Sequence, residues 1–481
     1  MTRRACLTTF GCQMNRLDSE LVRSLLEEAG YVMTESETEA DLILYNTCSV
    51  RENAENRVWG RLGSLKRTKK DNPDVIIGVL GCMAQKERER IFEAAPHVDL
   101  VCGTREFPDL LAYVDRVIEG HTHQLAVDDA RELTDVYARR RLRPGQFHAY
   151  VSVMRGCDNF CSYCIVPYVR GREQSRPIGE IVDEVKRLRD GGVIEVTLLG
   201  QNVSAYGTNI EGAGLAVLLR AVSEVGGIAR VWFVTGHPRD MNREVFEAMR
   251  DCPNVCEYLH MPAQSGSTRV LERMNRGYTR ERYLELVREA KDIVPGVGIA
   301  SDFIVGFPGE TDADFRETVS MVEACRFSMM FAFKYSPRPG TKAADYDDDV
   351  PYEVKQERNR ELLAVQERVA SEENAGFVGR TLEVLIEGPS KSRPDRLTGR
   401  SRDHRIVIIV KKGSDPFFTG AIVKKGSDPF FSGAIVPVTI TRSTPLSLYG
   451  RIAPVRTETA SPPGGEGMKK RFSGEQDGQG S

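Results

Sequence analysis

Apolar and polar positions follow two alternating patterns near the start of the chain. Short apolar runs of the β type alternate with stretches in which apolar residues return every three or four positions. The clearest helical stretch, RLDSELVRSLLEEAG (16–30), ends at Gly30, a residue favoured just past a helix end. Strands and helices that alternate in this way predict a parallel α/β domain over residues 1–120, with further helices at 52–69 and 86–95. The strand-like runs are ACLTTF (5–10), ADLILYNT (40–47), DVIIGVLG (74–81) and HVDLVCG (97–103).

A second set of six strand-like runs occupies the middle of the chain, and helical stretches separate them. Six βα units predict a partial TIM barrel, (βα)6, over residues 148–375. Residues 121–147 show little apolar periodicity and are predicted to be a linker from the Rossmann-like N-terminal domain. The six runs are AYVSVM (149–154), EVTLLG (195–200), RVWFVT (230–235), YLHMP (258–262), GIASDFIVGF (298–307) and FAFKYS (331–336).

Residues 376–456 carry short strand-like runs with Gly and Pro between them, which predicts a small β-barrel of OB type. This region holds 14 Lys and Arg against 6 Asp and Glu, whereas the whole chain has a net charge of −3. The excess of positive charge favours a polyanionic partner such as RNA. The alternative is a basic surface that only keeps the protein soluble.

A direct repeat interrupts this last domain. KKGSDPFFTGAIV (411–423) is followed at once by KKGSDPFFSGAIV (424–436). A small barrel has no room for a further strand pair without a change in its closure, so we expect one copy in the barrel and one copy looped out. Residues 457–481 are rich in Gly, Ser and charge and are predicted to be a disordered tail.

The most specific chemical signal is a C-x3-C-x2-C triplet formed by Cys157, Cys161 and Cys164. Three thiolates this close can bind three irons of a [4Fe–4S] cluster and leave the fourth iron open for a small molecule. A zinc site is the first alternative, but zinc usually takes four ligands and no fourth Cys or His lies nearby in the sequence. Three core cysteines are the second alternative.

The segment VSVMRGCDNFCSYCIVPYVRGRE (151–173) resembles the radical S-adenosylmethionine (SAM) enzymes. In that superfamily the amine and carboxylate of SAM bind the open iron. One electron then cleaves SAM into methionine and a 5′-deoxyadenosyl radical. The triplet follows the first strand of the predicted barrel, on the face where βα loops build active sites.

Three further cysteines, Cys12, Cys48 and Cys82, each follow a β-type run of the N-terminal domain. Strand carboxyl ends of a parallel sheet meet at one edge, so these thiols can converge and hold a second cluster. The alternative is that small apolar cysteines only fill the strand ends. Asn15, Asn46 and Gln85 lie beside them and are candidates either to donate to cluster sulfurs or to cap helices.

The 11 cysteines of the chain show no disulfide-style spacing. No apolar leader opens the sequence, and no apolar run is long enough to cross a membrane. A cytoplasmic location, where thiols stay reduced, is therefore expected.

Several side chains at the predicted strand ends are candidates for contact with SAM. Tyr163 is a candidate to pack on its adenine. Arg170 and Arg172 are candidates to pair with its carboxylate, with a structural ion pair as the alternative for one of them. The remaining candidates are polar groups or turn residues after strands, namely Gln201, Gln264, Gly306 and Pro308.

Over about residues 1–456 the chain resembles the radical-SAM methylthiotransferases, and the C-terminal barrel resembles their TRAM domain. The motifs FGCQMN, NTCSVRENAENR, GCMAQ, RGCDNFCSYCIVPYVRGREQSRP, LLGQNV, HMPAQSGS and DFIVGFPGE match in order. The resemblance implies that Cys12, Cys48 and Cys82 hold a second [4Fe–4S] cluster that carries or supplies sulfur. It also implies that one SAM methylates that sulfur. A second SAM gives the radical that abstracts hydrogen from C2 of an adenine.

NTCSVRENAENR and CIVPYVRGREQSRP resemble the branch that acts on N6-(dimethylallyl)adenosine at position 37 of tRNA. The other branches act on threonylcarbamoyladenosine in tRNA or on an aspartate of a ribosomal protein, and they are the alternatives. The implied partners are tRNA and an electron donor such as flavodoxin or ferredoxin, with no membrane, and we expect a monomer. A rival from another class is a non-catalytic iron–sulfur protein that only binds RNA.

Overall fold

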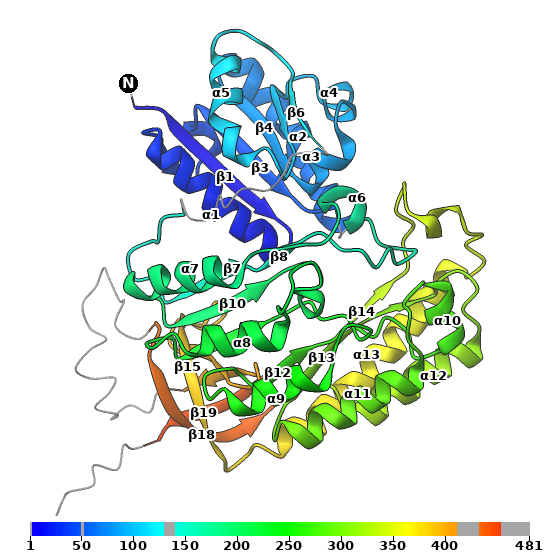
Figure 1. The fold of residues 1–481 in the computed structure, drawn as a ribbon. Coiled ribbons are helices and arrows are strands. Elements are labelled where there is room, and N and C mark those ends of the chain that lie inside the picture. The colour runs from blue at the N-terminus through cyan, green and yellow to red at the C-terminus, as the bar shows by residue number, and fades with distance from the viewer. Residues whose placement is uncertain (1, 50–51, 129–139, 411–431, 454–481) are drawn as a thin grey trace, which may run out of the picture.

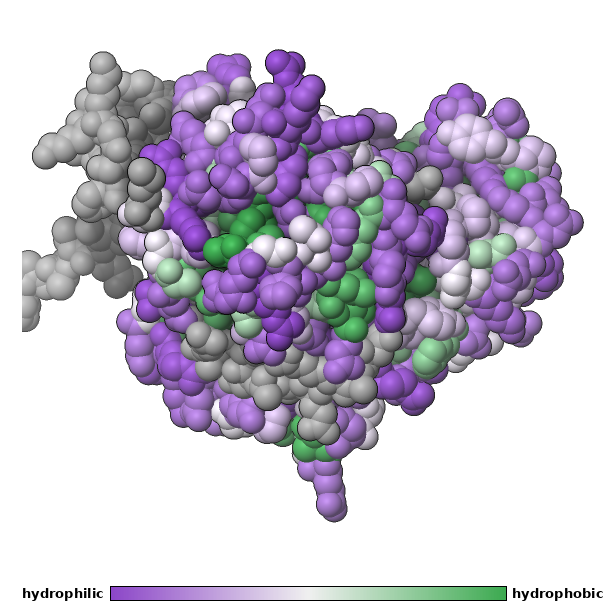
Figure 2. Space-filling view, turned by 90° about the horizontal axis from the view of Figure 1, so that it is seen from above, coloured by the Kyte–Doolittle hydropathy of each residue, from purple (hydrophilic) through white to green (hydrophobic). Residues whose placement is uncertain are grey.

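The computed structural model describes residues 2–49, 52–128, 140–410 and 432–453. Figure 1 shows an N-terminal α/β domain in blue and cyan, a central domain in green and yellow, and a small C-terminal barrel in orange. This architecture confirms the fold class predicted from the sequence. Among the described helices none is long and apolar enough to cross a membrane, and the face seen in Figure 2 is mostly hydrophilic.

The N-terminal domain is built on one parallel sheet. Its strands are β1 (Arg4–Phe10), β2 (Val32–Thr34), β3 (Leu42–Thr47), β4 (Ile76–Gly81), β5 (Leu100–Cys102) and β6 (Gln124–Ala126). They lie in the order β2-β1-β3-β4-β5-β6. The chain therefore winds in opposite directions from a switch point between β1 and β3, the place where open parallel sheets bind ligands.

Helices cover both faces of this sheet. They are α1 (Gln13–Glu28), α2 (Glu52–Asp71), α3 (Cys82–Glu87), α4 (Arg90–Ala94) and α5 (Leu110–Ile118). Helices α1 and α5 bury Leu17, Leu21 and Val114 on one face, and α2 buries Val58 and Leu62 on the other face. The apolar spacing of three to four residues in α1 thus packs one side of the helix on the sheet.

The central domain is a partial barrel of six parallel strands. They are β7 (His148–Ser152), β10 (Glu195–Leu199), β11 (Arg230–Phe233), β12 (Tyr258–His260), β13 (Gly298–Val305) and β14 (Met329–Lys334). They pair as β11-β10-β7 and β12-β13-β14, and a parallel bridge between Val231 and Val255 joins the two sets. All six strands predicted from the sequence are present, and they confirm the (βα)6 partial barrel.

Seven helices of the described chain alternate with these strands or follow them. They are α7 (Ile178–Asp190), α8 (Leu215–Ser223), α9 (Arg243–Asp251), α10 (Thr268–Arg273), α11 (Arg280–Ile293), α12 (Asp312–Cys325) and α13 (Tyr352–Ala375). Between β7 and α7 the chain forms the antiparallel pair β8 (Met154–Arg155) and β9 (Gln174–Ser175). The loop between β8 and β9 carries the Cys157–Cys164 triplet and the short helix α6 (Val166–Arg170).

The C-terminal domain is a closed five-stranded barrel in the order β15-β16-β17-β19-β18. Its strands are β15 (Thr381–Pro389), β16 (Leu397–Ser401), β17 (Ile406–Ile409), β18 (Ile435–Ser443) and β19 (Leu448–Ile452). Its interior is apolar, with Val384, Ile386 and Val438 fully buried. The small OB-like barrel predicted from the sequence is therefore present, including one strand, β16, that the sequence did not reveal.

This barrel covers the end of the central barrel at which the strands begin. Arg230, the first residue of β11, has a side chain that is 0% exposed and that pairs with Glu383 at 3.1 Å. The His404 ring stacks on Tyr258 with ring centroids 4.4 Å apart and lies edge-on to Trp232 at 5.0 Å. The C-terminal domain thus supplies the floor of the central barrel.

Two predictions about local structure differ from the observed chain. Residues 121–147 are not only a linker, because β6 adds an edge strand to the N-terminal sheet; this strand is too short to give a periodic pattern. The helix predicted at 86–95 begins at Cys82 and is interrupted at Arg88, whose φ is 48°. The tail predicted at 457–481 lies outside the described residues, and so do residues 411–431 of the repeat.

The second repeat copy contributes to the barrel. At the start of β18 the Gly433 N–H donates to the Ile386 carbonyl at 2.8 Å, and the Ile386 N–H donates to the Ala434 carbonyl at 2.8 Å. Deletion of residues 424–436 joins the first copy directly to Pro437, so the same GAIV sequence enters β18. We expect a soluble protein whose thermal unfolding midpoint and tRNA affinity match the parent's. Loss of soluble protein or of tRNA binding would show that both copies are required.

Candidate functional site

The structure brings the three N-terminal cysteines to the switch point of the parallel sheet. Cys12 follows β1, Cys48 follows β3, and Cys82 follows β4. The hydrogen bond from Cys48 lowers the pKa of the Cys12 thiol to about 6, against the effect of burial, and the Arg170 charge lowers it further. A Cβ on Gly11, whose φ is +151°, would lie 2.5 Å from the Cys48 Cβ, so this glycine is needed for the close approach.

Two buried asparagines hold these strand ends together. Asn15 Oδ1 lies 3.3 Å from Cys12 Sγ, and Asn15 Nδ2 donates to Asn46 Oδ1 at 3.2 Å. Asn46 Nδ2 in turn donates to Ser19 Oγ at 2.9 Å. Both asparagines are 0% exposed. The two asparagines therefore fix the geometry of the cysteine edge from within the domain.

Arg170, at the end of α6, reaches this edge from the central domain. Its Nε donates to Cys82 Sγ at 3.1 Å, and its Nη2 donates to Asp18 Oδ2 at 2.8 Å. The side chains of Arg170 and Asp18 are 4% and 0% exposed. Cys82 also packs against Ile165 and Val169. The carboxylate partner that the structure gives to Arg170 is thus Asp18, rather than a group near the Cys157–Cys164 triplet.

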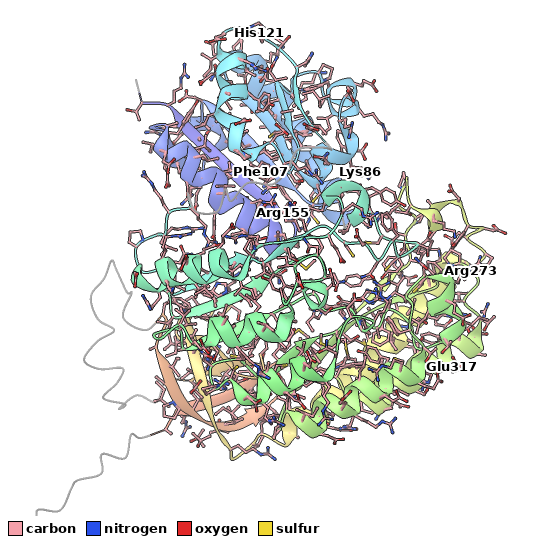
Figure 3. The ribbon with its side chains drawn as sticks, viewed as in Figure 1. Lys86, Phe107, His121, Arg155, Arg273 and Glu317 are labelled. Atoms are coloured by element: carbon pink, nitrogen blue, oxygen red, sulfur yellow. The ribbon has the colours of Figure 1, made fainter. Side chains whose placement is uncertain are left out.

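Figure 3 shows Lys86 and Arg155 at the boundary between the N-terminal and central domains. Lys86, on α3, pairs with Glu55 at 3.1 Å, and Arg338 of the central domain approaches the same carboxylate at 4.0 Å. These ion pairs add to the packing of α3 on α6. The two domains that carry the cysteine triplets are therefore in direct contact.

Replacement of Arg170 by Met is expected to lower the free energy of unfolding by about 3–5 kcal/mol, because it removes the guanidinium from a buried carboxylate. The Arg170→Met/Asp18→Leu double variant should recover most of this loss, since it removes both charges together. Chemical denaturation of the four proteins of this cycle measures the effect. Equal stability of the parent and Arg170→Met would contradict the contact. Arg172→Met is the matched control, because the Arg172 side chain is 77% exposed.

The second triplet lies in the loop that follows the first barrel strands. Gly156 has a φ of +76°, and a Cβ there would lie 1.9 Å from the Arg172 carbonyl oxygen, so only glycine allows this turn into Cys157. Burial raises the pKa of Cys157 to about 11 and that of Cys164 to about 12. Such thiols stay neutral unless a metal binds them.

The donor set of the Cys157–Cys164 triplet fits an iron–sulfur cluster. All three side chains offer sulfur, the ligand atom of such clusters. Within the residues that the structure describes, no group of three His, Cys, Asp or Glu side chains is arranged to hold one metal ion.

Arg276, which the sequence reasoning missed, holds the triplet loop in place. Its Nη1 lies 3.4 Å from Cys161 Sγ and 3.4 Å from Tyr163 Oη, and its Nη2 donates to the Pro262 carbonyl at 2.8 Å. The residue is 4% exposed. A buried Arg in the NRGY turn after α10 carries no motif that marks it in one sequence, so only the fold reveals it.

Some candidate SAM contacts lie at the triplet, whereas others make ion pairs or hydrogen bonds with other parts of the protein. Gln201 Oε1 accepts from the Gly156 N–H at 2.5 Å, and Tyr163 packs with Ile304 and Phe307. Gln201 therefore lies beside the triplet loop and Tyr163 belongs to it, while Arg172 pairs with Asp158 at 2.7 Å on the surface.

Three further candidates shape the barrel loops. Gln264, with a φ of +72°, bridges β13 through a backbone bond to Asp302 at 2.8 Å. The Pro308 carbonyl accepts from Arg273 at 2.7 Å. The space that Gly306 leaves is occupied by Lys355, whose Cγ would lie 2.3 Å from an added Cβ. Contact of any of these residues with SAM stays a prediction.

Comparisons with known proteins agree with this geometry. Residues 4–103 match the "Uncharacterized protein family UPF0004", residues 151–322 match the "Radical SAM superfamily", and residues 376–453 match the "TRAM domain". Among solved structures, the radical S-adenosylmethionine methyltransferase TsrM from Kitasatospora setae superimposes with a TM-score of 0.53 at 15% identity, covering 72% of this chain and 74% of that chain. This likeness supports the fold alone.

Sequence relatives are much closer. The tRNA-2-methylthio-N(6)-dimethylallyladenosine synthase of Moorella thermoacetica is 46% identical over 406 residues, which cover 84% of this chain and 91% of the relative. The synthase of the same name from Desulforamulus reducens is 44% identical over 452 residues, or 93% and 95% of the two chains. That of Akkermansia muciniphila is 42% identical over 468 residues, or 94% and 99%. At these identities and coverages, the chain belongs to the family of the tRNA-2-methylthio-N(6)-dimethylallyladenosine synthases, within the radical SAM superfamily.

Proposed function

We propose that this enzyme methylthiolates C2 of N6-(dimethylallyl)adenosine at position 37 of tRNA, with one SAM as methyl donor and another as radical source. Synthesis of 2-methylthio-N(6)-dimethylallyladenosine in tRNA is the activity named for its relatives, which align along nearly their whole length. The observation that carries the proposal is the pair of cysteine triplets, each at the carboxyl ends of parallel strands in domains that touch through α3 and α6.

Each triplet has a separate part in this proposal. Cys157, Cys161 and Cys164 would hold the cluster that binds SAM, and Cys12, Cys48 and Cys82 would hold a second [4Fe–4S] cluster. When bound, the first cluster supplies the electron that cleaves SAM, and the second carries the sulfur to be transferred. The protein's own groups fix the geometry: Arg276 holds the first loop at Cys161.

Arg170 presents positive charge to Cys82 from the central domain, as its 3.1 Å contact with the Cys82 sulfur indicates. A guanidinium beside a thiolate favours the charged ligand form that a metal requires. The site formed by Cys12, Cys48 and Cys82 is therefore completed by Arg170, which belongs to the central domain that carries the other cysteine triplet.

The C-terminal barrel would contact tRNA through basic side chains that remain exposed. Several arginines of this domain are used within the protein, such as Arg402, which pairs with Glu257 at 2.7 Å. The exposed positions on the described part of the barrel include Arg380, Lys391, Arg442 and Arg451. We also propose that the protein is a monomer in the cytoplasm. Its electron donor is a flavodoxin or a ferredoxin.

Nucleoside mass spectrometry of tRNA from a deletion strain tests this function. We expect the 2-methylthio derivative of dimethylallyladenosine to disappear and unmodified dimethylallyladenosine to accumulate, with recovery when the gene is restored. Loss of a methylthio group from threonylcarbamoyladenosine, or from a ribosomal-protein aspartate, would favour the other branches. Absence of SAM cleavage by reduced, reconstituted protein would favour a non-catalytic RNA-binding protein.

A further inference from the structure

Two phenylalanines on the last strand of the central barrel are exposed. Phe331 and Phe333 on β14 have 50% and 43% of their side chains accessible, and their rings are stacked with centroids 6.5 Å apart and planes at 21°. Burial of rings this large is normally favourable, so an exposed, ordered aromatic pair indicates a surface that binds something.

Strand geometry tells which way these rings face. Successive side chains of a strand point to opposite sides, and Met330 and Ala332 of β14 pack in the core with Leu362 of α13. Phe331 and Phe333 therefore face the other side, which is the interior of the partial barrel. Within the described chain β14 pairs only with β13, so the two rings stand at the open edge of that interior.

The pair lies next to the site of SAM chemistry. Phe333 is the register partner of Ile304, and Ile304 packs in the same cluster as Tyr163, the residue before Cys164. Phe331 is the register partner of Asp302, whose carboxylate lies 3.3 Å from the His260 ring. A flat ligand on the two phenylalanines would thus have the radical site at one end and a polar pair at the other.

We propose that Phe331 and Phe333 are the platform that receives the dimethylallyl-adenine of tRNA and selects it over an adenine that carries threonylcarbamoyl. This inference rests on the proposed function and names the residues that set its substrate. An adenine stacks on an aromatic ring with its π face, and the branched five-carbon chain gains from burial against apolar rings. Threonylcarbamoyl carries a carboxylate, which would lose hydration against the two phenylalanine rings. The Asp302 carboxylate, whose Oδ2 lies 3.3 Å from the His260 ring, offers hydrogen-bond acceptors to the adenine edge.

The test compares the affinities of reconstituted protein for two anticodon stem-loops that differ only in the group on the adenine, which is dimethylallyl in one and threonylcarbamoyl in the other. For the parent protein we expect the dimethylallyl RNA to bind about tenfold tighter or more. The Phe331→Ala/Phe333→Ala variant should bring this ratio close to one, and Phe331→Leu/Phe333→Leu should retain part of it, because Leu keeps apolar area but not stacking. A ratio is the readout because misfolding that weakens both RNAs equally leaves it unchanged.

Tyr352→Ala is the matched control, since Tyr352 is an aromatic residue, 59% exposed, on α13. It should keep the parent ratio and the parent rate of methylthiolation. A parent-like ratio in the double Ala variant, or no preference in the parent, overturns the platform. If the double Ala variant does not fold, the Leu variant and the two single Ala variants decide the question. Failure of the proposed function is recognised separately, because the parent would then leave dimethylallyladenosine in tRNA unmodified.

Discussion

Replacement of Cys157, Cys161 and Cys164 together by Ala should abolish reductive cleavage of SAM. These thiols are the proposed ligands of the cluster whose open iron binds SAM, and the described loop offers no other sulfur donors at that position. Two [4Fe–4S] clusters correspond to about eight irons per chain, so the variant should retain about four. Anaerobic reconstitution, iron analysis and chromatography of 5′-deoxyadenosine measure the two effects.

Cys252→Ala/Cys256→Ala is the matched control, because these cysteines have the same C-x3-C spacing but are buried in the core around α9 and β12. Their loss should leave the iron content and SAM cleavage unchanged. Full retention of iron in the triple variant would refute the assignment of the Cys157–Cys164 loop.

Replacement of Cys12, Cys48 and Cys82 by Ala should separate the two halves of the reaction. We expect reductive cleavage of SAM to continue, because these cysteines lie in another domain than the Cys157–Cys164 triplet, and methylthiolated tRNA to fall below detection. The measurement is 5′-deoxyadenosine and modified nucleoside in the same assay. Cys102→Ala is the control, since Cys102 ends β5 of the same sheet and is fully buried. Normal methylthiolated product from the triple variant would rule out the sulfur role of the N-terminal site.

The order and type of the large elements could be predicted because local patterns determine them. Each of the six barrel strands shows an apolar run, and α1 shows one apolar face. Strands β2, β6 and β16 escaped prediction, since a strand of three to five residues at an edge or in a small barrel has too few positions to show a period.

The cysteines could be identified from spacing and strand ends, but their partners could not. Arg170 is a candidate either for the SAM carboxylate or for a structural ion pair, and the ion pair that the structure shows is with Asp18, 152 residues away in the sequence. Its contact with SAM stays a prediction. Arg276 contacts Cys161 across 115 residues. Contacts at such separations depend on tertiary packing within and between domains, and a single sequence carries no local signal of that packing.

The charge of the C-terminal domain that is available to a partner also could not be predicted from the sequence. A count of Lys and Arg treats every positive charge as available to RNA. In the structure, Arg402 pairs with Glu257 of the central barrel, and Arg405 pairs with Asp403 in its own domain. The positive surface that remains for a polyanion is therefore smaller than the sequence count suggests.

The buried Arg230 has a consequence for how these parts can be recombined. Its guanidinium donates hydrogen bonds to the Arg400 carbonyl and to Glu383, both of which belong to the C-terminal barrel. A central domain cut free at about residue 375 would expose this cation together with the Trp232 and Tyr258 rings. The C-terminal barrel is thus not an interchangeable module, and its transplantation onto another catalytic domain requires that the matching floor residues be transplanted with it.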